Sequence, residues 1–401
     1  MSDKVVITGM GCISGLGKGI EANWRRLQEG QGAIRPLARQ GMDGVAAWIE
    51  PESLAGSERT ENMRRLGKLD PISLYALEAA QEAVEQANLV GHTALARRTA
   101  ILMGCGSGGN ATNDAAYERL FGRGQNKVHP QTIPSSMITA PTAHVAMLFG
   151  VHGPTFTLSS ACASSAHALG EAMHMIRAGR VDVAIAGGAE ACLSLGSWVG
   201  WQSLGVLAPD TCRPFSWERK GMVLGEGAAV LVLESENHAL ERGANVLGEL
   251  AGYGASSDAA HMTAPDLDGM TSAILQAHSD ADLDPTEPVL ISAHGTGTIL
   301  NDAAETKALH TVYGKALVRH KVIATKSAHG HMIGAGGAIE FLLGMKALKE
   351  GIIPPTLNYL GPDPDCDAPL ALTSERFEAD TLVSNSFAFG GLNAVLIGRR
   401  A

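Results

Sequence analysis

The amino-acid sequence predicts an α/β fold in which strands and helices alternate in layers. Short apolar runs typical of buried strands recur along the whole of the 401-residue chain, and longer runs with helical spacing lie between them. No low-complexity segment and no linker rich in proline or serine interrupts this alternation. A soft division lies at residues 250–256, so we expect two halves of one compact body, residues 1–250 and 251–401.

The expected elements follow one another in chain order. Each strand is a short aliphatic run, and each helix is a longer run in which apolar residues recur every three or four positions. The expected strands are residues 5–8, 99–103, 181–186, 228–233, 289–293 and 322–325, with further runs before Cys162 and from Leu382. The expected helices are residues 74–87, 164–178, 303–313 and 338–350.

Composition and charge argue against several classes of protein. Hydrophobic residues make up 45% of the chain and charged residues 18%, which is typical of a soluble globular protein. No run of about 18 apolar residues could span a membrane, and the N-terminus lacks the charged and apolar regions of a signal peptide. The net charge of −10 argues against nonspecific binding of nucleic acid.

The cysteines indicate a reducing environment. They lie at positions 12, 105, 162, 192, 212 and 366, and no two have zinc-binding or redox spacing. A disulfide framework is implausible in a chain of this length, because such frameworks belong to small secreted domains. We therefore expect a cytoplasmic protein.

Two glycine-rich segments resemble dinucleotide-binding loops. Gly9-Met-Gly11-Cys-Ile-Ser-Gly15 and Gly104-Cys-Gly106-Ser-Gly-Gly109 each follow a strand-like run. Ribose binding also needs an acidic residue after a second strand about 20 residues further on, and neither segment has a convincing one. We expect tight structural turns at both segments, with nucleotide binding as the alternative.

Cys162 is a candidate nucleophile. An apolar, β-prone run ends just before it, and small residues with helical spacing begin just after it, which predicts a strand, a sharp turn and a helix. A thiol at the start of a helix meets unpaired backbone N–H groups and the positive end of the helix dipole. Both favour the thiolate, which is the nucleophilic form. The alternative is a buried and unreactive cysteine.

Further segments place polar residues after strands. His294 follows the run at 289–293, Lys326 closes the run that begins at residue 322, and His329 and His331 lie in the glycine-rich loop after it. Ligands in α/β sheets bind beyond the carboxyl ends of strands, so we expect these side chains to share one rim with Cys162. Each of these residues, taken alone, also has a structural alternative. The histidines could simply be hydrogen-bonded within the fold, Lys326 could be a surface charge, and Glu340 could lie on a solvated helix face. Phe387 and Phe389 could belong to the core.

Taken together, the motifs resemble those of the β-ketoacyl-acyl-carrier-protein synthases of the thiolase superfamily, essentially from end to end. They are Val5-Val-Ile-Thr-Gly-Met-Gly, Ala161-Cys-Ala-Ser, Ala186-Gly-Gly-Ala-Glu190, Cys212-Arg-Pro-Phe-Ser216, Gly225-Glu-Gly227, His294-Gly-Thr-Gly-Thr298, Lys326-Ser-Ala-His-Gly-His331 and Ser386-Phe-Ala-Phe-Gly-Gly391. The set is similar to the elongating type II enzymes with a Cys-His-His site. Residues 211–216, 221–227 and 362–367 resemble the nodulation-type and polyene-type ketosynthases.

This resemblance implies a thiolase-like fold of two similar βαβαβ halves in an α-β-α-β-α arrangement. Cys162 would lie in the first half, and His294 and His331 in the second. The implied reaction is a decarboxylative Claisen condensation of an acyl chain on Cys162 with malonyl-acyl carrier protein. Its product would be a 3-oxoacyl-acyl carrier protein of fatty-acid or polyketide synthesis. The two histidines would polarise the malonyl thioester carbonyl, on which enolate charge develops.

The resemblance also implies supporting roles. Lys326 and Glu340 would orient and tune the region of His331. The remaining expected roles are support of the His294 loop by Asp302 and Glu305, pantetheine binding by Thr296 and Thr298, an oxyanion site at the N–H groups of Cys162 and Phe389, and an aromatic gate of Phe387 and Phe389. No metal or organic cofactor is implied, because the 4′-phosphopantetheine arm belongs to the carrier protein.

Four positions depart from the commonest pattern of the family. His329 stands where many relatives have threonine, and we assign the catalytic role to His331 because it follows the glycine. Ala388 replaces a usual glycine between the two phenylalanines, which could stiffen the gate, and Ser165 stands where glycine is common. Ser107 replaces a larger apolar residue that lines the acyl pocket in some relatives, so a long or unsaturated chain would have room.

The implied partners are acyl carrier proteins and a second ketosynthase-like chain. Acyl carrier proteins are acidic, and Arg64, Arg65 and Lys68 match a basic segment that relatives use to bind them, with Arg213 as a further candidate. A solvated helix face is the alternative for this segment. Family members are dimers, so we expect a homodimer or a heterodimer with a chain-length factor.

Two related proteins remain as alternatives. A thiolase would use a second cysteine in a C-terminal glycine-rich loop, where this chain has Phe389, and Cys366 lies instead in an acidic turn. A chain-length factor would lack the nucleophile, whereas Cys162 is present. The acyl substrate stays open between ordinary fatty-acid elongation and a specialised pathway to unsaturated or polyene chains.

Overall fold

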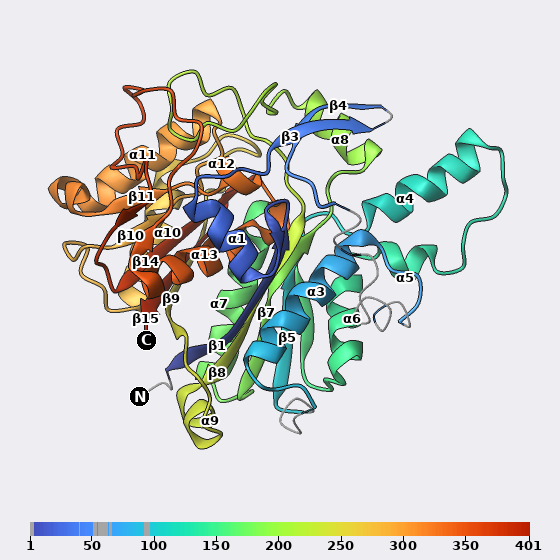
Figure 1. Ribbon diagram of the computed structural model, residues 1–401, viewed down its shortest axis with the longest axis horizontal. Helices are drawn as coiled ribbons and strands as arrows, with labels where there is room; N and C mark the ends of the chain where they lie inside the picture. Colours follow the sequence, from blue (N-terminus) through green and yellow to red (C-terminus); the bar gives the residue numbers. More distant parts are fainter. Residues whose placement is uncertain (1–3, 40, 51–53, 55–62, 64–65, 92–96) are drawn as a thin grey trace.

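The strands of the protein form two groups that have the same internal order (Figure 1). The computed structural model describes residues 4–39, 41–50, 54, 63, 66–91 and 97–401. The first group runs β6 (Thr155–Leu158), β5 (Thr99–Gly104), β7 (Val183–Glu190), β8 (Gly227–Ser235) and β1 (Val5–Ser14). The second runs β11 (Lys321–Ile323), β10 (Leu290–Ser292), β14 (Thr381–Ala388), β15 (Leu392–Arg400) and β9 (Gly248–Ser257).

The two groups correspond strand by strand. In the first group β5 is parallel to β6 and β7, and in the second β10 is parallel to β11 and β14. The other neighbouring strands of each group pair antiparallel. The two groups join into one sheet where Val6 pairs with Glu249 and Ile7 with Gly248. The boundary expected after residue 250 falls inside β9, which pairs with β15 of the second group along most of its length; that boundary stays a prediction.

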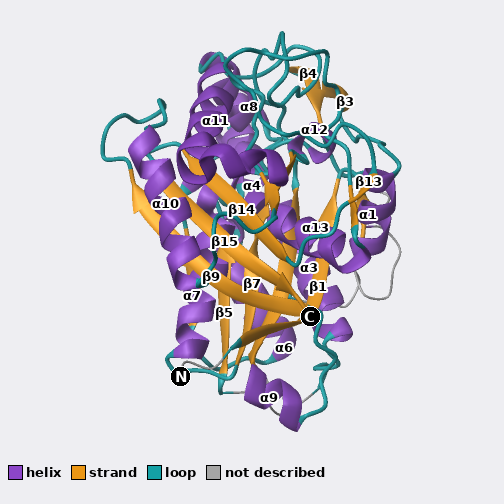
Figure 2. Ribbon diagram, turned by 90° about the vertical axis from the view of Figure 1, so that its left-hand side faces the viewer, coloured by secondary structure: helices purple, strands orange, loops and turns teal. Residues whose placement is uncertain are grey.

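Helices complete five layers, α-β-α-β-α, as the resemblance implied (Figures 1 and 2). The helices α3 (Pro71–Gln86) and α6 (Ala140–Phe149) cover the outer face of the first group, and α10 (Leu267–Asp280) and α11 (Ile299–Tyr313) cover that of the second. Between the two groups lie α7 (Ser164–Arg177) and α13 (Gly336–Glu350). The thiolase-like fold is therefore confirmed.

Alternation along β5 explains why these strands are apolar runs. Ile101 and Met103 belong to the outer core with α3, whereas Ala100 and Leu102 belong to the central core with α7. Successive side chains of a strand point to opposite faces, and here both faces are covered by helices. The sequence pattern therefore predicts the strands well but does not predict which of their side chains point to the outer core and which to the central core.

Gly9 and Gly11 do not form the turn that the sequence predicts. Both lie inside β1, and a Cβ atom at Gly11 would stand 2.2 Å from the carbonyl oxygen of Ala79, on α3. A Cβ atom at Gly9 would stand 2.0 Å from the carbonyl oxygen of Ala83, on the same helix. The glycines let α3 press directly onto the strand, which accounts for them without a nucleotide.

The remaining elements are short and connect the layers. They are β2 (Gly17–Lys18), α1 (Ile20–Gln28), β3 (Arg35–Arg39), β4 (Met42–Ala46), α4 (Asn110–Tyr117), the π-helix η3 (Glu118–Gly122), α5 (Thr132–Ser136), the 3-10 turn η4 (Ala161–Ala163), α8 (Leu195–Ser203), α9 (Glu236–Glu241), the 3-10 helix η5 (Gly314–Arg319), α12 (Lys326–His329), the 3-10 turn η6 (Ile333–Ala335), β12 (Ile352–Ile353) and β13 (Glu375–Arg376). Among the described residues, none of the helices is long and apolar enough to cross a membrane.

Most expected elements differ from the structure by a few residues at their ends, and two of these differences concern the site. The helix expected from residue 303 begins at Ile299, directly after Thr298. Lys326 does not close a strand, because it opens α12, the short helix that also contains His329.

Candidate active site

Cys162 lies in η4, the turn between β6 and α7, so the predicted order of strand, turn and helix is confirmed. The preceding Ala161 has φ 49°, a left-handed conformation that is uncommon for residues other than glycine. Space is short beneath this turn, because a Cβ atom at Gly104 would stand 2.3 Å from the backbone nitrogen of Ser165. Small residues around the cysteine are therefore required by the packing of α7 on β5.

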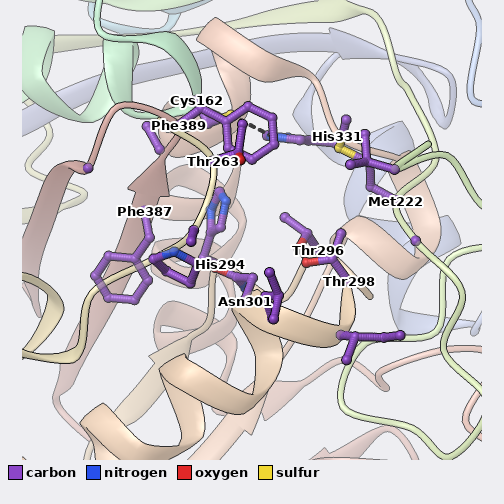
Figure 3. Close-up of a pocket in the computed structure, with 18 of the residues that line it drawn as sticks. Cys162, Met222, Thr263, His294, Thr296, Thr298, Asn301, His331, Phe387 and Phe389 are labelled. Atoms are coloured by element: carbon purple, nitrogen blue, oxygen red, sulfur yellow. Dashed lines mark hydrogen bonds between the residues drawn. The ribbon is translucent and has the colours of Figure 1, made fainter. Parts of the chain in front are cut away.

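The thiol of Cys162 is buried and contacts a histidine. Its Sγ lies 3.0 Å from Nε2 of His331, drawn as a dashed line in Figure 3. Burial raises the pKa of Cys162 to about 11, although the charge of Lys326 and the N–H group of Phe389 both lower it. At neutral pH the group is thus a thiol, contrary to the thiolate expected from its place at a helix start, because desolvation outweighs the stabilising groups.

Lys326 fixes the orientation and protonation of His294. Its Nζ donates hydrogen bonds to Nδ1 of His294 at 3.3 Å, to the carbonyl oxygen of His294 at 2.6 Å, and to Oε1 of Glu340. The three N–H donors of the ammonium group are therefore all used. Because Nδ1 of His294 accepts a hydrogen bond from Lys326, the ring proton of His294 resides on Nε2.

His331 lies on a loop that backbone hydrogen bonds hold in place. Its N–H donates to the oxygen of Val223 at 2.6 Å, and its oxygen accepts from the nitrogen of Gly225 at 2.9 Å. Its Nδ1 is buried and has no hydrogen-bond partner among the described residues, so the ring can carry its proton on Nε2. The rings of His331 and His294 meet edge to face, with centroids 5.4 Å apart.

Both of these histidines are neutral. Burial lowers the pKa values of His294 and His331 well below 6.5, and the charge of Lys326 lowers them further. Glu340 faces Lys326, and burial raises the pKa of Glu340 while the lysine opposes that shift. The result is a pair of neutral imidazoles, each of which has one N–H donor and one acceptor nitrogen.

His329 is turned into the protein, away from the thiol. Its Nδ1 lies 2.8 Å from the oxygen of Gly330, to which it donates, so its Nε2 accepts from the hydroxyl of Thr325 at 2.9 Å. Burial and Lys326 lower the pKa of His329 to about 3. Both ring nitrogens are thus satisfied in a structural role, which supports the assignment of the catalytic role to His331.

Two buried carboxylates shape the loop that follows His294. Glu305 accepts hydrogen bonds from the backbone nitrogens of His294 (2.8 Å) and Gly295 (2.9 Å) and from Asn385 Nδ2 (3.1 Å). Asp302 accepts from the nitrogens of Phe215 at 2.7 Å and Gly297 at 3.2 Å. Burial raises the pKa of Asp302 to about 7 and that of Glu305 as well.

A cavity of about 290 Å³ leads to the thiol (Figure 3). The hydroxyls of Thr296 and Thr298 lie 2.9 Å apart on its wall. Phe389 stacks at a tilt on Trp201, with ring centroids 6.2 Å apart. The predicted residues that line the cavity together are Cys162, His294, Thr296, Thr298, His331, Phe387 and Phe389.

Other predicted residues do not line this cavity. Ser107 is exposed, and its hydroxyl donates to Glu190 at 2.7 Å. Arg213 is ion-paired with Asp210 at 2.7 Å, and Lys68 is exposed. Arg64 and Arg65 lie outside the described residues.

Sequence profiles of known families match nearly the whole chain. Residues 2–239 match "Beta-ketoacyl synthase, N-terminal domain", and residues 247–360 match "Beta-ketoacyl synthase, C-terminal domain". The chain belongs to the β-ketoacyl synthase family. The family resemblance deduced from the motifs is therefore confirmed, and the enzymes of this family transfer acyl groups.

Individual β-ketoacyl synthases match from end to end. The chain is 41% identical over 400 residues to nodulation protein E of Rhizobium leguminosarum bv. trifolii, with 100% of both chains covered. It is 34% identical over 413 residues to 3-oxoacyl-[acyl-carrier-protein] synthase 2 of Staphylococcus aureus (strain COL), covering 99% of this chain and 98% of the relative. A solved structure titled "The ishigamide ketosynthase/chain length factor" has a TM-score of 0.92 at 33% identity, with 100% of both chains covered.

The same three side chains also have the spacing of a metal site. Cys162, His294 and His331 each offer one ligand atom, and these atoms lie within 4.8 Å of one another, the one such group among the described residues. Sulfur and imidazole ligands suit zinc. The ammonium group of Lys326, hydrogen-bonded to His294, opposes a further positive charge here. That the reaction needs no metal stays a prediction.

Sequence reasoning missed several residues of this site. Trp201 and Lys220 line the cavity, Arg219 donates to the backbone oxygen of Thr298 at 3.3 Å, and Asn385 donates to Glu305. No spacing in the sequence signals these contacts, because each joins segments that are distant along the chain. Glu190 lies in the family motif Ala186-Gly-Gly-Ala-Glu190, but no role for it is predicted from the sequence.

Proposed function

We propose that the chain is a β-ketoacyl-acyl-carrier-protein synthase, which joins an acyl chain held on Cys162 to malonyl-acyl carrier protein. One observation carries the proposal: Cys162 Sγ touches Nε2 of His331 at 3.0 Å at the end of a cavity that His294 also lines. Lys326 directs the proton of His294 to Nε2. A nucleophile and two neutral N–H donors thus meet in one site.

In the first half-reaction Cys162 takes the acyl chain from its carrier. The sulfur attacks the thioester carbonyl, the bond to the carrier's thiol breaks, and the thiol proton of Cys162 passes to the departing sulfur. His331 contacts the sulfur through Nε2, the nitrogen that carries its ring proton, so it acts here as a hydrogen-bond donor to Sγ and not as a base. The N–H group of Phe389, which already faces the sulfur, is placed to stabilise the oxyanion.

In the second half-reaction malonyl-acyl carrier protein loses carbon dioxide. The bond to the malonyl carboxylate breaks, and its electrons form an enolate whose oxygen accepts hydrogen bonds from His294 and His331. The enolate carbon attacks the acyl-Cys162 carbonyl, Cys162 leaves as the thiolate, and one proton taken up from solvent restores the thiol. The product is a 3-oxoacyl-acyl carrier protein, longer by two carbons.

The acyl chain is proposed to be long or unsaturated. Nodulation protein E and the ishigamide ketosynthase are among the proteins that this chain resembles most, which favours a specialised pathway over housekeeping synthesis. That Ser107 leaves room for such a chain stays a prediction, because Ser107 does not line the cavity that leads to Cys162. A chain-length preference unaffected by Ser107→Ile would remove this part of the proposal.

The proposed partners are an acyl carrier protein and a second ketosynthase-like chain. Lys68 and Arg213 are the described members of the proposed carrier surface. Within the described residues β6 pairs with β5 on one side only, and Phe156 on β6 is exposed, so this edge suits a dimer. The similar solved structure of a ketosynthase with a chain-length factor supports a heterodimer as the alternative to a homodimer. Location in the cytoplasm stays a prediction.

The test is a condensation assay with purified acyl and malonyl carrier proteins, read by the mass of the carrier-bound product. The wild type should form the 3-oxoacyl product, and Cys162→Ala should form none. His294→Ala and His331→Ala should still accept the acyl chain, while decarboxylation falls by about 100-fold or more, the typical effect of removing a positioned donor. Condensation by Cys162→Ala at the wild-type rate would contradict the proposal.

A further inference from the structure

The mouth of the cavity carries one cation that the proposed reaction does not use. Among the described residues lining the cavity, Lys220 is the only lysine or arginine. Its neighbours are engaged, since Arg213 pairs with Asp210 at 2.7 Å and Arg219 with Asp363 at 2.5 Å. Lys220 is exposed and has no ion-pair partner in the described part of the chain.

The backbone holds Lys220 beside the two threonines of the cavity wall. Gly221, the next residue, donates from its nitrogen to the oxygen of Gly297 at 3.0 Å, and Gly297 lies between Thr296 and Thr298. A Cβ atom at Gly297 would stand 3.0 Å from the oxygen of Gly221, so the two segments are in direct contact. The ammonium group of Lys220 therefore reaches solvent at the same opening as the threonine hydroxyls.

The negative charges around Lys220 leave it available. Asp258 is the one acidic residue among the described lining residues, and it accepts hydrogen bonds from Asn393 Nδ2 at 2.6 Å and from the nitrogen of Asp266 at 3.0 Å. Asp210 is held by Arg213. Asp258 and Asp210 are thus both engaged by other groups, and the charge of Lys220 can act on a ligand.

We propose that Lys220 binds the phosphodiester of the carrier protein's 4′-phosphopantetheine arm. The inference rests on the proposed function, because that arm has a thioester at one end and a phosphodiester at the other. When the thioester reaches Cys162 and the arm passes Thr296 and Thr298, the phosphodiester emerges at the opening beside Lys220. A lysine binds phosphate as a point charge, so the interaction is modest and weakens with salt.

The test measures binding of the arm alone and needs no turnover. NMR titrations compare phosphopantetheine with pantetheine, which lacks the phosphate, at low ionic strength. The wild type should bind the phosphorylated form about three- to fivefold more tightly, as expected for a partly exposed ion pair. Lys220→Ala should remove this preference and Lys220→Arg should keep it. Lys315→Ala changes an exposed lysine outside the cavity lining and should leave the preference intact.

The outcomes separate the two proposals. Equal affinities in the wild type, or a preference that survives Lys220→Ala, would overturn the phosphodiester assignment. A raised KM for malonyl-acyl carrier protein in Lys220→Ala, with the preference for the phosphorylated arm unchanged, would also overturn it and assign Lys220 to the carrier's protein surface. Acylation of Cys162, followed in parallel by intact mass, tests the proposed function separately, since phosphate preference without acylation would contradict that function alone.

Discussion

Lys326 organises the site although it makes no bond to a reacting atom in the proposed mechanism. Its three donors are shared between His294 and Glu340, which sets the tautomer of one imidazole. Its charge also disfavours a second positive charge on either catalytic histidine. Ring N–H donors that are already oriented need no rearrangement as enolate charge develops. In the proposed mechanism this is why they lower the barrier to decarboxylation.

The pH dependence of decarboxylation should report this arrangement. Because burial and Lys326 hold the pKa values of His294 and His331 well below 6.5, both stay neutral as pH falls through 6.5. The rate should therefore fall only at more acidic pH. In Lys326→Met/Glu340→Gln the lowering charge is gone, so the acid limb should move upward toward 6.5.

The measurement is the pH profile of carbon dioxide release from malonyl-acyl carrier protein. Lys346→Met is the matched control, because Lys346 lies on the same helix as Glu340 and is ion-paired with Glu21 and Glu350. Its profile should coincide with that of the wild type. An acid limb at the same pH in the double variant would contradict the role assigned to Lys326.

The assignment of His331 over His329 can be tested by exchange for threonine. His329→Thr loses hydrogen bonds to Gly330 and Thr325 and should lower the free energy of unfolding by about 1–3 kcal/mol at pH 7.5 while leaving condensation within about threefold of wild type. The folded-state pKa of about 3 lies below the ordinary 6.5, so the contribution of neutral His329 is full above 6.5 and lost as pH falls toward 3.

Denaturant unfolding at several pH values, together with the condensation rate, measures both effects. His331→Ala should show the opposite pattern, with a lost decarboxylation rate. A loss of about 100-fold or more in His329→Thr, typical of a missing acid–base group, would reverse the assignment.

The sequence was sufficient to predict site residues that lie in recognisable motifs. It was insufficient to predict site residues that come from segments distant along the chain. Cys162 and His294 follow strands, so pattern and chemistry together indicate them. Trp201 and Lys220 enter the site only because α8 and the segment before Gly221 fold back over the cavity. The protonation of Cys162 also escaped prediction, because the helix start is visible in the sequence and the degree of burial is not.

At the scale of elements, the glycines of β1 show what a pattern leaves undecided. A glycine signals a need for space or for an unusual backbone angle, and sequence alone does not separate the two. Gly9 and Gly11 provide space for α3. By contrast Gly390, with φ 83°, adopts the backbone angle that glycine favours, in the loop directly after Phe389. The strands were predicted more reliably than the role of these glycines, because a strand that is buried on both faces is an uninterrupted apolar run in the sequence.

The helix α8 is expected to restrain the gate. Trp201 on α8 packs against Phe389, and aromatic pairs contribute about 0.5–1.5 kcal/mol. In Trp201→Leu the position of Phe389 seen here is less favoured, so the gate should open more readily without an acyl chain. Carbon dioxide release in the absence of acyl donor, divided by product formed in its presence, should rise about two- to tenfold.

Trp217→Leu is the control for this experiment, because Trp217 is exposed and does not line the cavity. It should leave the ratio of uncoupled release to product unchanged. The same ratio in Trp201→Leu as in wild type would show that α8 does not restrain Phe389.

At the scale of the whole molecule, the two halves contribute different parts of one reaction. The nucleophile lies in η4, directly before α7, in the first half, and His294 and His331 follow strands of the second. The chemistry therefore depends on the packing of α7 and α13 between the two groups of strands. The order of strands is the same in both halves, and this symmetry follows from family resemblance rather than from any repeat visible in the sequence. The choice between homodimer and heterodimer lies in the partner, which the sequence of one chain does not contain.

The most direct test of the central claim is the intact mass of the protein after incubation with carrier proteins that bear saturated and conjugated acyl chains. The wild type should gain the mass of one acyl group, Cys162→Ala should gain none, and unsaturated chains should load fastest. Acylation of Cys162→Ala to the same extent, or no acylation of the wild type by any chain even when a partner subunit is supplied, would contradict the account.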